Sequence, residues 1–256
     1  MTAALLNTSF TLAPAEAMKF FNAKGLSAQF DWHGLLAEEH NDAFMVAKMM
    51  DLDLLADTKA VIKALQATGK LGDAESALEK MWKARGWWGS TEMLNPKTGE
   101  LQKARIGSPA RLQLVIDTNM RTAAAQGYHQ SVERRKAERP YLAYSSILDG
   151  RTRKLHRQWH GLVLRVDDPW WETHYPPNGY GCRCRVISLT EAQARAMGKT
   201  KPDTAPANDG YYEWKNPDTG IVEIIPNGVD PGWNYHAGRD RSARLAALLR
   251  QKIKAA

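Results

Sequence analysis

The sequence predicts an α+β fold, in which a helical N-terminal half is followed by a small mixed α/β unit with short strands and by a C-terminal helix. Two observations lead to this prediction. Before residue 140, apolar residues recur at helical spacing between Gly and Pro breaks. After it, short aromatic and β-branched runs alternate with turn residues, as in strands. Of the 256 residues 43% are hydrophobic, which is enough for a core. We expect three regions, 1–104, 105–201 and 202–256.

Four helices are expected in the first region. Apolar spacing and Gly or Pro punctuation place them at residues 14–25, 31–50, 53–68 and 73–85. The second has the weakest pattern, because its apolar positions fit a helical period only broadly. Gly69 should end the third helix, and the Asp73 carboxylate should cap the start of the fourth.

The longest helix is expected over residues 108–139, because Ser108 can cap it and Pro109 suits its first position. Strands are expected at residues 141–148, 162–166 and 183–187, and a basic helix at 239–256. Asn216-Pro217-Asp218-Thr219-Gly220 is a turn signal between two strand-like runs and predicts a β-hairpin. A near copy of this turn stands at residues 95–99.

The charge of the chain is concentrated in its middle. The net charge is +7, and residues 105–201 alone carry 17 Lys and Arg against 8 Asp and Glu. Arginine, which binds phosphate or carboxylate through two parallel hydrogen bonds, supplies 13 of those 17 cations. This pattern indicates either contact with nucleic acid or an acidic protein, or a solvated basic surface.

Several classes of protein are disfavoured by composition. Two cysteines do not make a disulfide-rich secreted scaffold, and no apolar run approaches the roughly 20 residues of a membrane-spanning helix. The first residues lack the basic start of a signal peptide, which makes the cytosol the default compartment. The nucleophile-elbow, P-loop and dinucleotide-binding glycine motifs are absent from the sequence.

Both cysteines and three of the seven histidines fall within 29 positions, from His156 to Cys184. Zinc is held by four Cys or His ligands that come from short segments, and this cluster supplies them. The favoured ligand set is His156, His174, Cys182 and Cys184, with His160 as a substitute. The alternative is a pair of buried reduced thiols beside hydrogen-bonded histidines.

Other chemistry remains open for the same region. His156 or His160, with Arg151, Asp149 and either Tyr141 or Tyr144, could cleave RNA without a metal. The histidine would act as acid or base, and the arginine would stabilise the charged phosphorane. A structural interpretation has Asp149 and Arg151 bridging a turn, and Thr152 capping a helix that carries His156. The candidate phosphate-contacting residues are Arg151, Arg153, Arg183 and Arg185.

One long pattern runs through this region: Asp149-x-Arg151-Thr152-x-x-x-His156, Gly161, Asp167-Asp168-Pro169-x-Trp171-x-x-His174-Tyr175-Pro176-Pro177-Asn178-Gly179 and Cys182-Arg183-Cys184. Further motifs span nearly the whole chain, among them Phe21-Asn22-Ala23-Lys24-Gly25, Gly86-Trp87-Trp88-Gly89 and Gly228-Val229-Asp230-Pro231-Gly232-Trp233-Asn234-Tyr235. Together they resemble the phage Mu F-like head morphogenesis (minor head) proteins.

The resemblance implies a structural protein, not an enzyme, that is present in few copies in the head of a tailed phage or prophage. Its expected partners are portal and capsid or scaffold proteins, with DNA as a further candidate; no membrane and no small-molecule substrate are expected. The implied location is the virion interior, or the host cytoplasm during assembly. The alternative function is a metal-independent nuclease delivered with the genome.

The resemblance also bears on the zinc ligands. Relatives often carry Cys where this chain has His156, which supports a ligand role for that residue. Relatives often have a histidine just before the Cys-x-Cys pair, where this chain has Gly179. We expect His174 to compensate for that difference.

Overall fold

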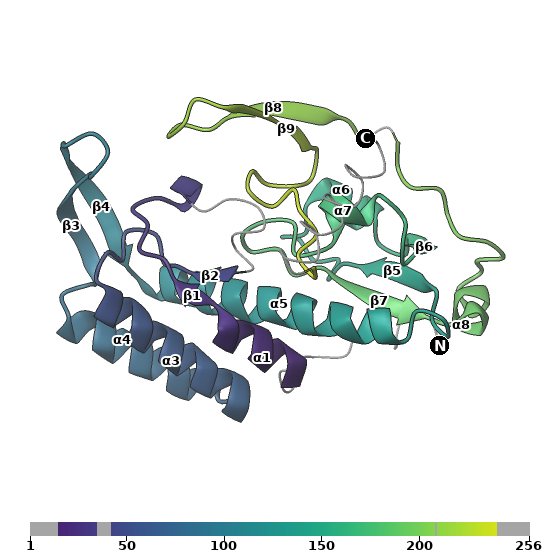
Figure 1. Cartoon of the computed structure of the whole chain (residues 1–256), viewed down its shortest axis with the longest axis horizontal. Helices are drawn as coiled ribbons and strands as arrows, with labels where there is room; N and C mark the ends of the chain where they lie inside the picture. The colour runs from purple at the N-terminus through teal and green to yellow at the C-terminus, as the bar shows by residue number, and fades with distance from the viewer. Residues whose placement is uncertain (1–14, 35–41, 208, 240–256) are drawn as a thin grey trace, which may run out of the picture.

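A long helix, α5 (Pro109–Arg134), runs along the molecule and joins a helical end to a sheet-containing end (Figure 1). The computed structural model describes residues 15–34, 42–207 and 209–239. Within these residues helices and small sheets coexist, which confirms the predicted α+β class. Ser108 caps α5 by accepting a hydrogen bond from the Arg111 N–H at 3.2 Å, as predicted. The helix ends at Arg134, before the predicted position 139, and residues 135–138 form turns.

Three helices pack beside α5: α1 (Ala15–Ala23), α3 (Leu52–Thr68) and α4 (Leu71–Ala84). Of these, α1 reaches the later part of α5, where Glu16 pairs with Arg134. Their apolar side chains, with Trp82, Trp87 and residues of α5, form the first hydrophobic core. Gly69 ends α3 in the left-handed conformation, as predicted. The predicted cap of α4 is wrong, because Asp73 lies inside its first turn and Lys70 precedes it without a side-chain cap. The structure instead shows a cap at Asp51, which accepts the first N–H groups of α3.

The predicted helix over residues 31–50 is wrong in its described part except at Asp42, which is helical. A short 3₁₀ turn, η2 (Trp32–Gly34), is followed by strand β2 (Ala43–Phe44), which pairs in parallel with β1 (Gly25–Leu26). Phe44, Val46 and Met49 are buried in the first core, and a spacing of two then three residues is not helical. Residues 35–41 lie outside the described part of the chain.

The other end is built on a three-stranded antiparallel sheet of order β6–β5–β7, from β5 (Tyr141–Ser145), β6 (Val163–Arg165) and β7 (Arg185–Leu189). Two short helices, α6 (Lys154–Gln158) and α7 (Trp171–His174), lie between its strands in sequence. A third, α8 (Glu191–Ala196), was not predicted, although Thr190 and Gln193 form a capping box at its start. The second core is rich in aromatic side chains, including Tyr144, Trp159, Trp171, Tyr175, Trp233 and Tyr235.

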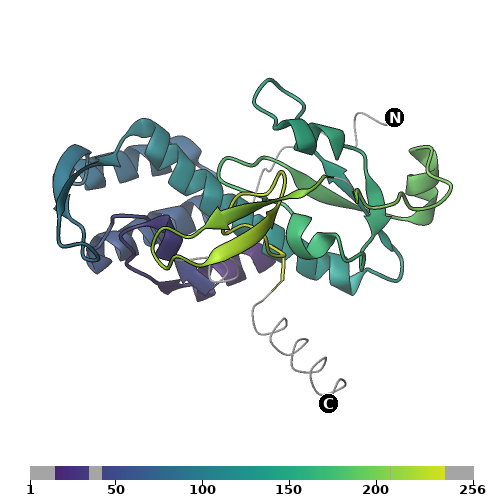
Figure 2. The same ribbon diagram turned by 90° about the horizontal axis from the view of Figure 1, so that it is seen from above.

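Two hairpins carry the repeated turn. β3 (Gly89–Leu94) pairs with β4 (Leu101–Gly107), and β8 (Tyr211–Lys215) pairs with β9 (Val222–Pro226), as the second turn signal predicted. In each turn the Asn side chain accepts an N–H two residues later, and its backbone closes the loop. Lys97 at one tip donates to Asp218 at the other. Figure 2 shows the β8–β9 hairpin lying across the middle of the molecule.

The predicted C-terminal helix, from residue 240 onward, lies outside the described residues. In the part of the chain that the structure describes, no helix combines the length and the apolar character needed to cross a membrane.

Candidate metal centre

Three of the predicted zinc ligands meet where α6 faces the segment before β7. His156 lies on α6, and Cys182 and Cys184 lie in the extended residues just before Arg185, where β7 begins. One ligand atom from each of these side chains lies within 4.8 Å of the others. The predicted strand, residues 183–187, included Cys184. Both cysteines precede the observed strand, but their thiols still face the same histidine.

The His156 ring is held in one orientation. Its Nδ1 lies 3.8 Å from Cys182 Sγ and 3.4 Å from Cys184 Sγ. Its Nε2 lies 2.7 Å from the carbonyl oxygen of Gly228, which can only accept a hydrogen bond. Nε2 therefore carries the proton, and the Nδ1 lone pair points to the two thiols.

The two thiols are largely shielded from solvent, and neighbouring groups shift their pKa values. His156 and Cys182 are buried, and Cys184 is half-buried. The hydrogen bond from the Cys182 thiol is the main cause that lowers the pKa of Cys184 to about 6, and the Ser146 hydroxyl lies 3.4 Å from the Cys184 sulfur. The same contact, together with burial, raises the pKa of Cys182. The site thus favours a thiolate at Cys184, and thiolates are the form that binds metal.

His174 does not join this group. Its Nδ1 lies 3.1 Å from the Trp170 carbonyl oxygen and 2.8 Å from the Thr173 hydroxyl, and its ring stacks on Trp170. Burial lowers its pKa to about 4, so the ring is neutral at physiological pH. His160, the predicted substitute, also lies outside the group, and its Nδ1 accepts the Ser146 backbone N–H at 3.0 Å.

Gly179 stands where relatives were expected to carry another histidine. A Cβ at this position would collide with the Asp230 carboxylate and with Arg153. A ligand-bearing side chain therefore has no room at position 179 in this chain.

Asp149 organises the rim of the site. Its carboxylate accepts two hydrogen bonds from Arg183, at 2.7 and 2.5 Å, and others from the Arg151 N–H and the Thr152 hydroxyl. The Arg183 guanidinium is the main reason that the pKa of Asp149 lies well below its ordinary value. The predicted capping role of Thr152 is wrong, because its hydroxyl bonds Asp149 while Arg153 occupies the N-cap of α6.

Of the four candidate phosphate-contacting arginines, two hold the fold together. Arg183 pairs with Asp149, and Arg153 donates to Asp230 at 2.7 Å and to the Tyr180 carbonyl at 3.2 Å. Arg151 is exposed beside Asp149, and Arg185 begins β7.

Three positioning residues were not assigned from the sequence: Ser146, Gly228 and Asp230. The last two lie in the Gly228–Tyr235 motif, which was the available signal. A cavity of about 30 Å³ adjoins the three ligand atoms. It is lined by Ile147, Arg151, Thr152, Arg153, His156, Gly181, Cys182, Arg183 and Cys184. One water molecule needs about 10–15 Å³, so the space suffices for a small fourth ligand.

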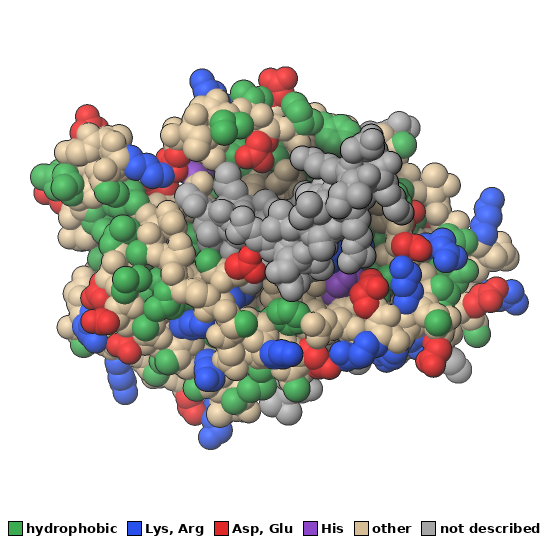
Figure 3. Space-filling view, in the orientation of Figure 1, with side chains coloured by type: hydrophobic (Ala, Val, Ile, Leu, Met, Phe, Trp, Pro, Cys, Tyr) green, Lys and Arg blue, Asp and Glu red, His purple; other side chains and the backbone are tan. Residues whose placement is uncertain are grey.

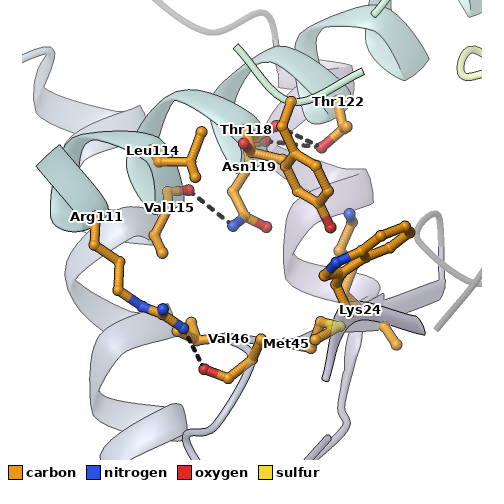
Figure 4. A pocket seen from close by; sticks show the side chains of 13 residues that line it. Lys24, Met45, Val46, Arg111, Leu114, Val115, Thr118, Asn119 and Thr122 are labelled. Carbon is orange, nitrogen blue, oxygen red and sulfur yellow. Dashed lines mark hydrogen bonds between the residues drawn. The ribbon is translucent and has the colours of Figure 1, made fainter. Parts of the chain in front are cut away.

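A larger pocket of about 290 Å³ lies between α5 and the β1–β2 segment. Figure 4 shows Arg111 and other α5 residues along one side, and Lys24, Met45 and Val46 along the other. Burial lowers the pKa of Lys24 to about 8. Arg111 donates to the carbonyl oxygens of Ala47 and Arg105 and so ties the pocket wall together.

A second group of possible ligands, Asp31, His33 and Asp218, lies near the hairpin tips. Lys48 binds Asp31 at 2.9 Å, and Lys97 binds Asp218. Since ammonium groups already neutralise both carboxylates, this group is better explained as an ion-pair network.

The comparisons with known proteins agree with the motifs. Residues 58–187, which include the three convergent ligands, match the phage Mu protein F like protein family. The chain belongs to this family of phage proteins. It is 31% identical over 259 residues to a protein of Escherichia phage Mu that carries the provisional name capsid assembly protein F, an alignment covering 95% of the chain and 58% of that protein.

A second relative is the Mu-like prophage FluMu F protein of Haemophilus influenzae. It is 33% identical over 250 residues, covering 90% of the chain and 58% of that protein. The chain therefore spans little more than half the length of these two relatives. No solved structure matches the chain.

Proposed function

We propose that this chain acts in the assembly of a phage head, as a structural protein that binds other head proteins near the portal. The observation that carries the proposal is its family membership, with a relative of 31% identity named for capsid assembly. Because the chain spans 58% of that relative, the proposal concerns this part of such a protein.

The β8–β9 hairpin offers a surface for such contacts. Tyr211, Val222 and Ile224 are 68%, 53% and 58% exposed, and the register places them on one face of the hairpin. Exposed apolar patches of this kind commonly mark protein–protein contact sites. This surface, which we call the outer hairpin face, is the candidate docking site for a head protein.

The rest of the hairpin is anchored. The Trp214 ring stacks on Trp32 with centroids 5.7 Å apart, and Asp218 pairs with Lys97. The Tyr212 hydroxyl donates to the Val229 carbonyl oxygen at 2.9 Å. These contacts hold the inner face and the tip of the hairpin against the rest of the molecule. The outer hairpin face can therefore meet a partner without a rearrangement of the hairpin.

Protein contacts are better supported than DNA contacts. Arg153 and Arg183 are engaged in internal pairs, as described above. On the face drawn in Figure 3, Lys and Arg side chains are interspersed with Asp and Glu rather than gathered in one basic strip. Extended phosphate binding relies on such clustered cations.

The geometry lends little support to a metal-independent nuclease that uses His156 as its acid or base. His156 is 2% exposed, and both of its ring nitrogens face protein atoms. An acid–base histidine needs a nitrogen within reach of substrate.

The test is genetic complementation in the phage that encodes the chain. Without the gene, we expect few DNA-filled heads by electron microscopy, and the wild-type gene should restore them. A Val222→Asp/Ile224→Asp variant should restore them at least about tenfold less well, because charges buried in an interface cost more than the ~1.4 kcal/mol that a tenfold change represents. Normal head numbers without the gene would refute the proposal.

The matched control is Leu94→Asp/Leu101→Asp, which places the same two charges on a facing pair in the β3–β4 hairpin. It should assemble normally. Circular dichroism of both variants separates lost docking from lost folding.

A further inference from the structure

We propose that His156, Cys182 and Cys184 bind one zinc ion through three protein ligands, and that a solvent molecule occupies the fourth position. The inference rests on the site alone and holds whether or not the head-assembly role is correct. It differs from the ligand set predicted from sequence, which included His174.

The spacing of the ligand atoms suits a tetrahedral ion. Zinc binds thiolate at about 2.3 Å and imidazole nitrogen at about 2.0 Å, which places neighbouring ligand atoms roughly 3.5 Å apart. His156 Nδ1 lies 3.4 and 3.8 Å from the two sulfur atoms. If His156 only formed a hydrogen bond with one thiol, the second thiol would have no reason to lie near the same nitrogen.

The surroundings are those of a metal-binding histidine. The Gly228 carbonyl oxygen accepts from Nε2 at 2.7 Å, which leaves Nδ1 unprotonated and aimed at the thiols. Such a hydrogen bond on the far nitrogen accompanies nearly all histidine ligands of metals. The Ser146 hydroxyl lies 3.4 Å from Cys184 Sγ and also donates to the His156 carbonyl oxygen at 2.5 Å. One residue thereby links the histidine segment to a thiol.

Charge balance also suits a divalent ion. Two thiolates cancel the charge of Zn²⁺ and leave a neutral centre, which is the arrangement that a mostly buried site tolerates. The flanking guanidinium groups of Arg153 and Arg183 stay paired with Asp230 and Asp149, so neither competes for the thiolates.

The fourth position is open. Among the described residues, no other His, Cys, Asp or Glu ligand atom joins the three within 4.8 Å. The 30 Å³ cavity at the site provides the room for solvent. Three protein ligands with a solvent molecule form a known zinc arrangement, the one that leaves a position for an incoming group.

The first experiment measures zinc by elemental analysis in the full chain, produced in zinc-supplemented medium and purified without chelator and with reduced thiols. We expect one zinc ion per chain, and little or none in Cys182→Ser/Cys184→Ser. His174→Gln and His160→Gln are the matched controls and should keep the ion. Absence of zinc in folded wild-type chain with reduced thiols would overturn the proposal, as would loss of zinc in either control.

A second measurement uses the wild-type chain alone, so its result does not depend on whether the cysteine variant folds. Replacing zinc by Co²⁺ should give intense visible bands of a four-coordinate ion and thiolate-to-cobalt charge transfer. Azide should then change the spectrum by displacing solvent at the fourth position. Absence of the cobalt bands would refute the site, and a spectrum that azide leaves unchanged would refute the open position.

Discussion

Gly228 controls how His156 is presented to the thiols, because its carbonyl oxygen holds Nε2. Its φ of +87° lies in the left-handed region, and a Cβ there would lie 2.5 Å from the buried Trp159 ring. Gly228→Ala should therefore strain the backbone and displace the carbonyl. We expect a loss of about 1–3 kcal/mol in the free energy of unfolding. Urea denaturation followed by tryptophan fluorescence measures it.

Gly150→Ala is the control for that substitution, since a Cβ at position 150 would meet no atom within 4 Å and its φ is not in the left-handed region. It should leave the denaturation midpoint nearly unchanged. Equal midpoints for the two variants would contradict the left-handed backbone and the close approach of Trp159 at position 228.

The spacing of Cys and His residues in the sequence predicted where the metal site lies, but not which residues belong to it. The clustering of Cys and His identified the three side chains that converge, because clustered ligand types are visible in sequence. His174 was misassigned because the direction of its ring is set by Trp170 and Thr173, which form hydrogen bonds with its Nδ1. Thr152 was misassigned for a similar reason, since the Asp149 carboxylate competes for its hydroxyl. Both outcomes depend on tertiary contacts that one-dimensional spacing does not contain.

At the scale of elements, local chemistry predicted the helices with strong end signals. Ser108 and Pro109 marked the start of α5, and Gly69 marked the end of α3. Residues 31–50 carried no comparable signals, and their buried positions are set by packing rather than by a helical stripe: Phe44 packs on Phe21 of α1, and Met49 contacts Thr58 of α3. The turn formed by the repeated Asn-Pro-x-Thr-Gly sequence was predicted correctly because its hydrogen bonds lie within five residues.

The caps of α3 and α4 offer a test at this scale. Asp51 accepts the N–H groups of Asp53 and Leu54 at 2.9 and 3.1 Å, whereas Asp73 makes no cap bond. Asp51→Ala should therefore cost about 1 kcal/mol of unfolding free energy, and Asp73→Ala only about 0.3 kcal/mol from its favourable position near the helix N-terminus. Thermal unfolding measures both. Asp51→Asn should keep most of the stability, and a larger loss at Asp73 than at Asp51 would contradict the structure.

At the scale of the whole molecule, α5 joins two cores of different chemistry. The first is mainly aliphatic and formed by helices, and the second is aromatic and receives the segment 225–237. His129 on α5 and His236 on that segment meet with ring centroids 4.5 Å apart. A Cβ at Gly238 would lie 2.5 Å from the His129 Cβ, so the segment packs tightly on the helix. Both histidines are buried at this junction, which makes it sensitive to proton uptake.

Burial, with the nearby charges of Arg239 and Lys136, lowers the pKa of His129 to about 4, although Glu133 lies 3.6 Å from its ring. Burial also lowers the pKa of His236. An unfolded histidine takes up its proton near pH 6.5, so between pH 6.5 and 4 the unfolded chain holds more protons. The free energy of unfolding should therefore fall as the pH drops through this range, by up to about 1.4 kcal/mol per pH unit for His129 alone.

Urea denaturation at pH 7, 6, 5 and 4.5 measures this slope. His129→Gln removes one titrating group from the junction, so its unfolding free energy should fall less steeply with acid than that of the wild type. Carboxylates away from His129 contribute equally to both proteins, and the difference between the two slopes therefore reports on His129 and its neighbours Glu133 and His236. A variant slope equal to that of the wild type would mean that His129 takes up its proton as readily in the folded chain as in the unfolded one, which is incompatible with its burial against His236.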